Sequence, residues 1–442
     1  MIKIKYIAII ATLFVTSLKA QEPADSTVTL DKAISIALIN NFDLKIASNE
    51  LKQAQNSNSI GNANLLPSVT LNGGAEYSKN DTELEFTGNP NREIIDDATS
   101  SSYNANVRVD YTLFDGLGNV YTLKKLRSSD ELQQTIYKQQ MELTMLEVIE
   151  NYYEVCRAQE NLNLAHETMK ISRDRYNRVL DQKSYGQASQ LDVLNAEVDL
   201  NNDSTTILNV EQSFLMSLKN LNVSLGLPVQ QEYSVDESFN LDYDKNADYV
   251  ISSAMMNNSN LISQQQQVNI KDLDVKITKA QKYPTLQAYG QYAYSQQNND
   301  AGLMKFSQTD GMTGGVTLKF NVFNGRQQHT NEQNATLNLL SEQERSNQIR
   351  AQIERDASNA YTDYIYKVRI VELQQSSMGQ AKLNFEQTKE MFQIGRVNSI
   401  EFRAAQQNLL NVAYQYNDAR FNAKVAEFYL LRITGDLIKD EN

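Results

Sequence analysis

Two carboxylates, Asp192 and Glu401, are the residues whose positions most clearly suggest a chemical role. Each follows a glycine that interrupts a helical pattern. Those glycines are Gly186 and Gly395. Carboxylates held around a narrow opening repel one another and favour cations over anions. A structural interpretation is equally direct, since the helix dipole favours a carboxylate in a first turn by about 0.3 to 1 kcal/mol. Both interpretations require these residues to begin helices that return from a turn.

Catalytic or ligand-binding chemistry of other kinds finds little support in the chain. It has two histidines and one cysteine, Cys156, whose nearest histidine in sequence, His166, lies too far along a helix to activate the thiol. No HExxH, CxxC, GxSxG or Gly-rich phosphate loop occurs. A net charge of −13 offers no phosphate-neutralising surface, which argues against nucleic acid as a partner. We predict a protein that is not an enzyme and that uses no cofactor or metal.

The amino-terminal residues have the pattern of a secretory signal peptide. Lys3 and Lys5 precede an apolar run over residues 6–15, and small or neutral residues follow as far as Ala20. The run is too short to span a bilayer as a helix, which takes roughly 20 residues. We therefore expect residues 1–20 to be removed.

The remaining sequence consists of two copies of one internal repeat. Similar residues recur in the same order at an offset of 217 near the start of each unit and of 209 later. The matched pairs are Asn41 with Asn258, Pro67 with Pro284, Phe114 with Phe323, Gly186 with Gly395, and Gly226 with Gly435. These matches predict a first repeat over residues 21–228 and a second over residues 229–442.

Each repeat contains a long tract without proline, Asn91–Leu227 and Thr285–Asn442. Proline inside a helix costs about 3 kcal/mol, so both tracts are free to be helical. Apolar residues at three- and four-residue steps predict amphipathic helices with coiled-coil character. A helix over Gly118–Ser184 would extend for about 100 Å. We expect a long helical hairpin in each repeat, with its turn near residue 186 in the first and near residue 395 in the second.

Short segments between the helical tracts alternate strictly between apolar and polar residues. They are residues 67–78, 102–114, 284–294 and 312–323. Their polar faces include Arg108, Asp110, Lys319 and Asn321, whereas their apolar faces end in Tyr and Phe. This pattern favours tilted membrane strands that enclose a polar interior, although alternation alone also allows a soluble hairpin. The polar segment Asp81–Ser102 predicts a long loop between the first two strands.

Four strands in one chain are too few to close a membrane barrel, because the smallest such barrels need about eight. An open sheet edge in lipid would leave backbone N–H and C=O groups unsatisfied. The membrane interpretation therefore requires association of several copies. The predicted fold class is mainly α with membrane β, in which a shared barrel continues into a long helical coiled coil.

With these features the sequence resembles the TolC-like outer-membrane efflux proteins, or outer membrane factors, from Leu30 to about Gly435. The most specific motifs are Phe114-Asp115-Gly116 at a strand-to-helix junction and Tyr185–Glu197 between two long helices, with a looser second copy at Ile394–Gln406. The resemblance implies a homotrimer in the cell outer membrane, surrounded by outer-membrane lipid. It also implies a twelve-stranded barrel continued by a periplasmic α-helical coiled-coil tunnel.

The same resemblance implies the exit duct of a tripartite efflux or type I secretion system. Such a duct receives substrates from an inner-membrane pump of RND or ABC type through a periplasmic adaptor (membrane fusion) protein. Adaptor docking is implied at the two hairpin ends. The residues expected there are Gly186, Gln187, Ser189, Gly395, Asn398 and Ser399. A glycine C-cap followed by a Ser or Asn N-cap builds such a turn, and a turn that serves only as a connector stays an alternative.

Family members also imply a periplasmic gate, or constriction, lined by acids at the positions of Asp192 and Glu401. We assign Asn195 and Arg396 to the same constriction. The sequence departs from the family pattern at Ala404, where a second acid is expected, and at Arg396, where the basic residue is displaced by one position. An acidic aperture is therefore expected, but the detailed network around it is not.

A different class of protein, a non-transporting outer-membrane coiled-coil adhesin or envelope spacer, is the alternative. It predicts one strand-rich anchor and a single rod, which two copies with strands between the helices fit poorly. Within the transporter class, the pump selects the cargo. The sequence therefore leaves open whether the substrate is a drug, a metal or a protein.

Overall fold

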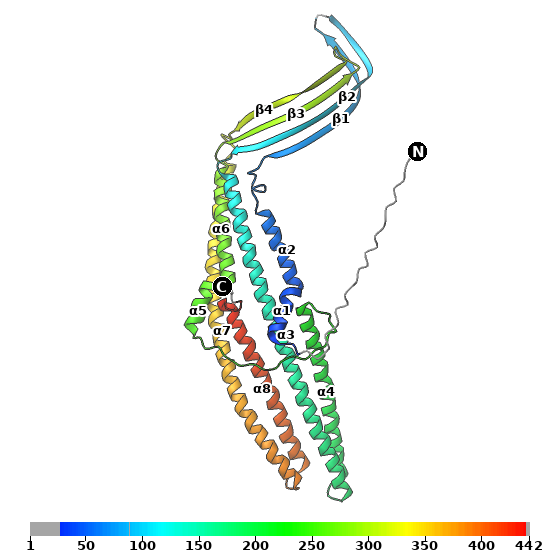
Figure 1. Cartoon of the computed structure of the whole chain (residues 1–442), viewed down its shortest axis with the longest axis vertical. Coiled ribbons are helices and arrows are strands. Elements are labelled where there is room, and N and C mark those ends of the chain that lie inside the picture. The colour runs from blue at the N-terminus through cyan, green and yellow to red at the C-terminus, as the bar shows by residue number, and fades with distance from the viewer. Residues whose placement is uncertain (1–26, 88, 439–442) are drawn as a thin grey trace, which may run out of the picture. The chain divides into compact units, whose positions relative to one another are not determined.

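The computed structural model describes residues 27–87 and 89–438, so the expected signal peptide lies outside the described residues (Figure 1). The helices are α1 (Leu30–Asn40), α2 (Phe42–Ser57), α3 (Gly118–Ser184), α4 (Gln190–Leu225), α5 (Ala247–Asn257), α6 (Ser259–Ala280), α7 (Gln327–Gln393) and α8 (Ser399–Thr434). The strands are β1 (Ser68–Phe86), β2 (Asn89–Phe114), β3 (Thr285–Asn299) and β4 (Phe306–Lys319). None of the helices in this described part has both the length and the apolar character needed to cross a bilayer.

The chain forms two compact units, each built from separate segments of sequence. The first unit comprises the described residues up to Asn41, Glu147–Leu241 and Val368–Val425. The second comprises Phe42–Leu146, Asp242–Lys367 and the described residues from Ala426 onward. The first unit holds the ends of both long helical hairpins, and the second holds the sheet.

The predicted internal repeat is confirmed by the lengths of the helices. Helices α3 and α7 each have 67 residues, and α4 and α8 each have 36. One hydrogen bond also recurs in both repeats. The Asn41 side-chain amide donates to the Ser224 carbonyl at 2.8 Å, and the Asn258 amide donates to the Ile433 carbonyl at 3.0 Å. Each bond satisfies a carbonyl in the last turn of a long helix, which would otherwise lack a partner.

Two glycines recur for the same steric reason. Gly226 and Gly435 follow α4 and α8 with φ of 68° and 79°, the left-handed conformation that favours glycine. A Cβ atom at Gly435 would lie 2.7 Å from the Asn257 carbonyl oxygen, and one at Gly226 would collide with the Asn40 carbonyl oxygen. Any other residue at either position would force the two helix ends apart.

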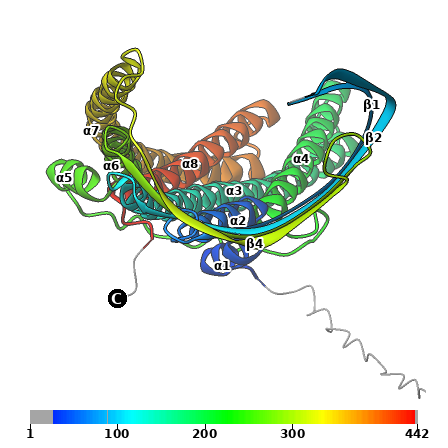
Figure 2. The same ribbon diagram turned by 90° about the horizontal axis from the view of Figure 1, so that it is seen from above.

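The four strands form one antiparallel sheet in the order β1-β2-β3-β4, and Figure 2 shows that its strands are strongly bent. The register pairs Val69 with Val109, Val109 with Gly290, and Gly290 with Gly314. Within the described chain, β1 pairs only with β2 and β4 only with β3. The sheet therefore has two free edges.

The register gathers the apolar residues of all four strands on one face. Leu71 is 78% exposed there and Met312 is 88% exposed. Other apolar residues on this face are Val69, Tyr77, Tyr103, Val107, Val109, Tyr111, Tyr292, Val316 and Leu318. On the opposite face, Arg108 Nε donates to Asp110 at 2.8 Å and the guanidinium lies 4.5 Å from the centre of the Tyr289 ring. One sheet face is thus apolar but exposed, and the other is polar.

The strand boundaries differ from the sequence prediction. The segment Asp81–Ser102, predicted as a long loop, instead belongs almost entirely to β1 and β2, whose pairing continues to Phe86 and Asn89. This ribbon extends past β3, whose pairing with β2 ends at Ser100. Cross-strand backbone bonds and ion pairs such as Arg92 with Glu83 override the polar composition. At the other end, β4 stops at Lys319, so residues 320–323, predicted as strand, lie outside it.

Candidate functional site

The ends of the two hairpins have the same backbone geometry. Gly186 and Gly395 have φ of 73° and 74°, and a Cβ atom at either would meet no atom within 4 Å. The N–H of Gln187 donates to the Gln182 carbonyl at 2.8 Å, and the N–H of Arg396 donates to the Met391 carbonyl at 2.9 Å. These bonds close each long helix in the manner of a Schellman turn. Both turns therefore present bare backbone to solvent.

Reciprocal N-caps begin the two returning helices. Ser189 Oγ accepts from the N–H of Asp192 at 3.2 Å, while the Asp192 carboxylate accepts from the Ser189 N–H at 2.8 Å. In the second repeat, Asn398 Oδ1 accepts from the N–H of Glu401 at 2.9 Å, and the Glu401 carboxylate accepts from the Asn398 N–H at 3.1 Å. Both arrangements are capping boxes. Asn398 is therefore the N-cap of the second returning helix, and Ser399, expected at the same hairpin end, is the first residue of α8.

Hydrogen bonds from the Ser189 side chain and backbone lower the pKa of Asp192 below its ordinary value. A carboxylate whose folded pKa is lowered stabilises the fold above its unfolded pKa, and that contribution is lost as the pH falls through the folded pKa. Asp192 is therefore ionised at neutral pH. Its capping role is directly visible, and that role leaves its negative charge in place.

The other predicted gate residues are not drawn together within one chain. Asn195 and Arg396 are exposed, and the described residues contain no ion pair that joins Arg396 to Asp192 or Glu401. The displaced position of Arg396 thus leaves it without the internal partner that a tight gate network would need. Ala404 is likewise exposed.

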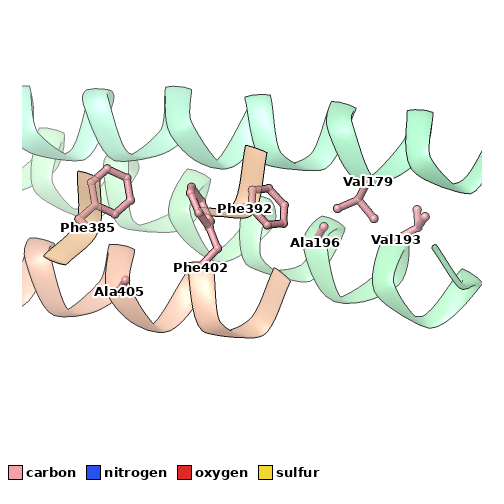
Figure 3. Close-up of a cluster of buried hydrophobic side chains, with 7 residues drawn as sticks. All are labelled: Val179, Val193, Ala196, Phe385, Phe392, Phe402 and Ala405. Atoms are coloured by element: carbon pink, nitrogen blue, oxygen red, sulfur yellow. The ribbon is translucent and has the colours of Figure 1, made fainter. Parts of the chain in front are cut away.

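A hydrophobic cluster packs the two hairpins against each other close to their ends. It contains residues from α3, α4, α7 and α8, and Figure 3 shows their side chains between the helices. The members are Val179, Val193, Ala196, Phe385, Phe392, Phe402 and Ala405. The Phe402 ring centre lies 4.7 Å from that of Phe392 and 5.6 Å from that of Phe385. These ring contacts join α7 to α8 within the second hairpin, and the cluster as a whole brings them together with Val179, Val193 and Ala196 of the first hairpin.

A polar network lies next to this cluster and joins α4 to α8. The Arg403 guanidinium donates two hydrogen bonds to the Asp203 carboxylate, each at 2.7 Å. Ser172 on α3 also donates to Asp203, and it accepts from Gln406 at 2.9 Å. Burial lowers the pKa of Arg403, but the hydrogen bonds and charge of Asp203 outweigh this and raise it above its usual value. Arg403 therefore holds Asp203 through a bidentate contact.

A second arginine extends the network to the start of α8. Arg175 on α3 is only 3% exposed, pairs with Asp199 on α4 and donates to the Ser399 carbonyl at 3.3 Å. Asp199 also lies 3.7 Å from the Arg403 guanidinium. Arg175, Asp199 and Asp203 belong to the first hairpin, and Arg403 reaches both aspartates from the second. We call these four residues the interhairpin ion network.

This network was not predicted from the sequence, although the sequence contains one indication of it. Asp199 and Asp203 are four residues apart on one helix, where like charges destabilise each other unless a cation lies between them. Their partners, Arg175 and Arg403, come from different helices, and no spacing rule relates them to the aspartates. The lone cysteine carries no such chemistry, because Cys156 is fully buried and burial raises the pKa of its thiol.

The outer membrane efflux protein family matches residues 33–227 and 250–436. The chain belongs to this family. The match covers both repeats, including both hairpin ends and the interhairpin ion network.

Two curated relatives of this outer membrane efflux protein come from Pseudomonas putida. A probable efflux pump outer membrane protein, TtgC, is 24% identical over 198 residues, which is 45% of this chain and 40% of the relative. The pyoverdine export outer membrane protein OpmQ is 25% identical over 262 residues, which is 58% of this chain and 54% of the relative. The chain thus spans about half the length of the curated relatives it matches.

Solved structures show the same fold at low sequence identity. The CmeC outer membrane channel of Campylobacter jejuni superposes with a TM-score of 0.76 at 16% identity, covering 100% of this chain and 95% of that one. The outer membrane protein VceC of Vibrio cholerae gives a TM-score of 0.73 at 15% identity, covering 92% of this chain and 96% of that one. The resemblance therefore extends over both units and is not limited to one repeat.

Proposed function

We propose that this chain is one protomer of a trimeric exit duct in the outer membrane, which passes substrates outward from a periplasmic adaptor and an inner-membrane pump. The observation that carries the proposal is a four-stranded sheet with two free edges in a chain that also carries two long helical hairpins. Each free edge carries backbone N–H and C=O groups without partners. Copies of the same chain can pair these groups edge to edge and so close a barrel. Family membership supports transport over the adhesin or spacer alternative and over an enzyme.

The exposed apolar face of the sheet supports insertion into lipid. An apolar patch of this extent on a soluble protein would promote aggregation, whereas a bilayer covers it. The polar face, which carries Arg108 and Asp110, would then line the interior of the barrel. Outer-membrane lipid is accordingly the proposed partner of the apolar face.

The hairpin ends support docking of an adaptor. Tyr185 is 80% exposed and Ile394 is 67% exposed, each directly before the glycine of its turn. An exposed apolar side chain beside bare backbone suits a partner that packs closely against the turn. Neither hairpin indicates whether the pump is of RND or ABC type, and neither indicates the substrate.

We expect Gly186→Trp and Gly395→Trp to leave insertion intact and to abolish export, because the indole would occupy the space through which a partner reaches the turn. Any side chain at these positive φ angles is strained, by about 1 kcal/mol. Gly186→Ala and Gly395→Ala carry that strain without the bulk, so they are matched controls. Accumulation of a fluorescent efflux substrate in the native host measures export. Normal export by both tryptophan variants would identify the turns as simple connectors.

We expect the doubly neutralised variant Asp192→Asn with Glu401→Gln to lose preference for cations in planar bilayers. A trimer would present each carboxylate three times around one axis, and the amides remove that charge with little change in volume. Both amides keep an oxygen that can accept the capping hydrogen bond, so the helix starts are retained. Reversal potentials in a salt gradient are the measurement. An unchanged cation preference would limit both acids to capping.

A further inference from the structure

A groove in the first unit lies where α3, α7 and α8 meet, farther from the hairpin ends than the interhairpin ion network. Its volume is about 250 Å³. Apolar side chains line part of it, including Leu164, Met378 and the buried Ala413, together with the ring of Tyr416. Ligand pockets usually have volumes of about 300–1,000 Å³, so this groove can take one apolar portion of a larger molecule.

Two carboxylates line the groove along the same helix. Glu160 and Glu167 are separated by two turns of α3, which puts them on one face about 10 Å apart. Glu160 pairs with Arg420 at 3.3 Å. Glu167 is exposed and makes no hydrogen bond or ion pair with any other described residue. One carboxylate of the groove is therefore neutralised by the chain and the other is not.

Neighbouring groups add to the negative charge. Glu237 lies beside Glu160, and its burial together with the charge of that carboxylate raises the pKa of Glu237 above its ordinary value. Glu160 and Glu237 therefore both lie near one cation, Arg420. Arg420 is the cation in this group, and its guanidinium lies 5.5 Å from the ring centre of Tyr416. Arg420 already lies over the Tyr416 ring, so Glu167 is the group in the groove that remains to attract a positive charge.

We propose that this groove binds an amphiphilic monocation, with its apolar part against Leu164 and Met378 and its positive charge at Glu167. Burial of the apolar part supplies the attraction, and the unpaired carboxylate selects for positive charge. An anion would be repelled. A divalent metal lacks ligands, because no three acidic, histidine or cysteine side chains form a metal-binding group in the described chain. This proposal goes beyond the duct function, because it gives the helices that form the groove a ligand-binding site of their own.

The test uses the full-length protein in lipid nanodiscs and the fluorescent monocation rhodamine 6G, with signal from empty nanodiscs subtracted. We expect saturable binding by the wild type and about fivefold weaker binding by Glu167→Gln, the loss expected for one solvent-exposed charge contact. Asn163→Trp, which places an indole at the exposed rim of the groove, should abolish saturable binding.

Glu211→Gln is the matched control, because Glu211 lines a separate groove on α4, together with Leu208 and Leu215, whose lining also includes a cation, Lys219. This variant should bind rhodamine 6G like the wild type. The anionic dye 8-anilinonaphthalene-1-sulfonate should show no loss of binding in Glu167→Gln. Equal affinity of wild type and Glu167→Gln for rhodamine 6G would overturn the proposal. Absence of saturable binding by the wild type, as when a second copy covers the groove, would overturn it too. None of these measurements requires export, so they stay separable from the proposed function.

Discussion

Arg403→Ala is expected to loosen the contact between the two hairpins by about 3 kcal/mol or more, because it leaves the Asp203 carboxylate buried without its partner. The Asp203 side chain is only 7% exposed and receives two hydrogen bonds from Arg403. Local opening at this level should therefore become at least about a hundredfold more frequent. Amide hydrogen exchange in residues 168–206 measures that opening directly. If the chain forms the proposed duct, single-channel conductance should rise in the same variant.

A rescue variant separates the charge from the packing. Asp203→Leu with Arg403→Met replaces the pair by apolar side chains of similar size, a change that often preserves or increases stability. Arg396→Ala is the control for loss of an arginine near the hairpin ends, because Arg396 is exposed and lacks an ion-pair partner among the described residues. Amide hydrogen exchange in Arg396→Ala should be the same as in the wild type. Unchanged exchange in Arg403→Ala would mean that the hydrophobic cluster alone holds the hairpins.

Phe402→Ala is expected to cost about 3 to 5 kcal/mol of local stability, the usual cost of removing a buried phenyl ring. Phe402 is 4% exposed and packs on Phe385 and Phe392 of the neighbouring helix. The cavity would open beside the interhairpin ion network, so both contacts between the hairpins should weaken together. Limited proteolysis should then cleave within residues 385–410 while the sheet-bearing unit stays intact.

Ile400→Ala is the matched control, because Ile400 lies two residues earlier on the same helix but is 70% exposed. Surface substitutions of this kind usually change stability by less than about 0.5 kcal/mol. Equal protease resistance of Phe402→Ala and Ile400→Ala would show that the aromatic cluster does not hold the hairpin ends. If Ile400→Ala were cleaved more readily and Phe402→Ala were not, the exposed surface around Ile400 would hold the hairpin ends instead.

The features that depend on nearby residues were accessible from sequence. Helix α3 has the predicted bounds, Gly118–Ser184, because a long amphipathic pattern without proline ends at a glycine. Ser189 is the predicted N-cap, and its partner Asp192 lies only three residues away. The repeat and the division of the sheet into apolar and polar faces were equally clear, since both are properties of order and period along the chain.

Strand length was harder, because it depends on pairing across the sheet. The polar composition of Asp81–Ser102 indicated a loop, but nothing local reports the cross-strand bonds that make it a ribbon. The sequence did contain an indication of the difference, since the change of offset falls between Pro67 and Phe114 and the ribbon of the first repeat is the longer one.

The interhairpin ion network was decided by tertiary structure alone. Arg175, Asp199 and Arg403 belong to three different helices, and their meeting depends on how the hairpins rotate about their axes as they pack. A rotation of one residue would turn Arg403 toward solvent without changing any helical pattern in the sequence. The sequence by itself determined the repeat, the helices, the turns and their caps, because each arises from residues a few positions apart. Which charges became buried partners was decided by packing, because that choice depends on the contact surface of one helix against another.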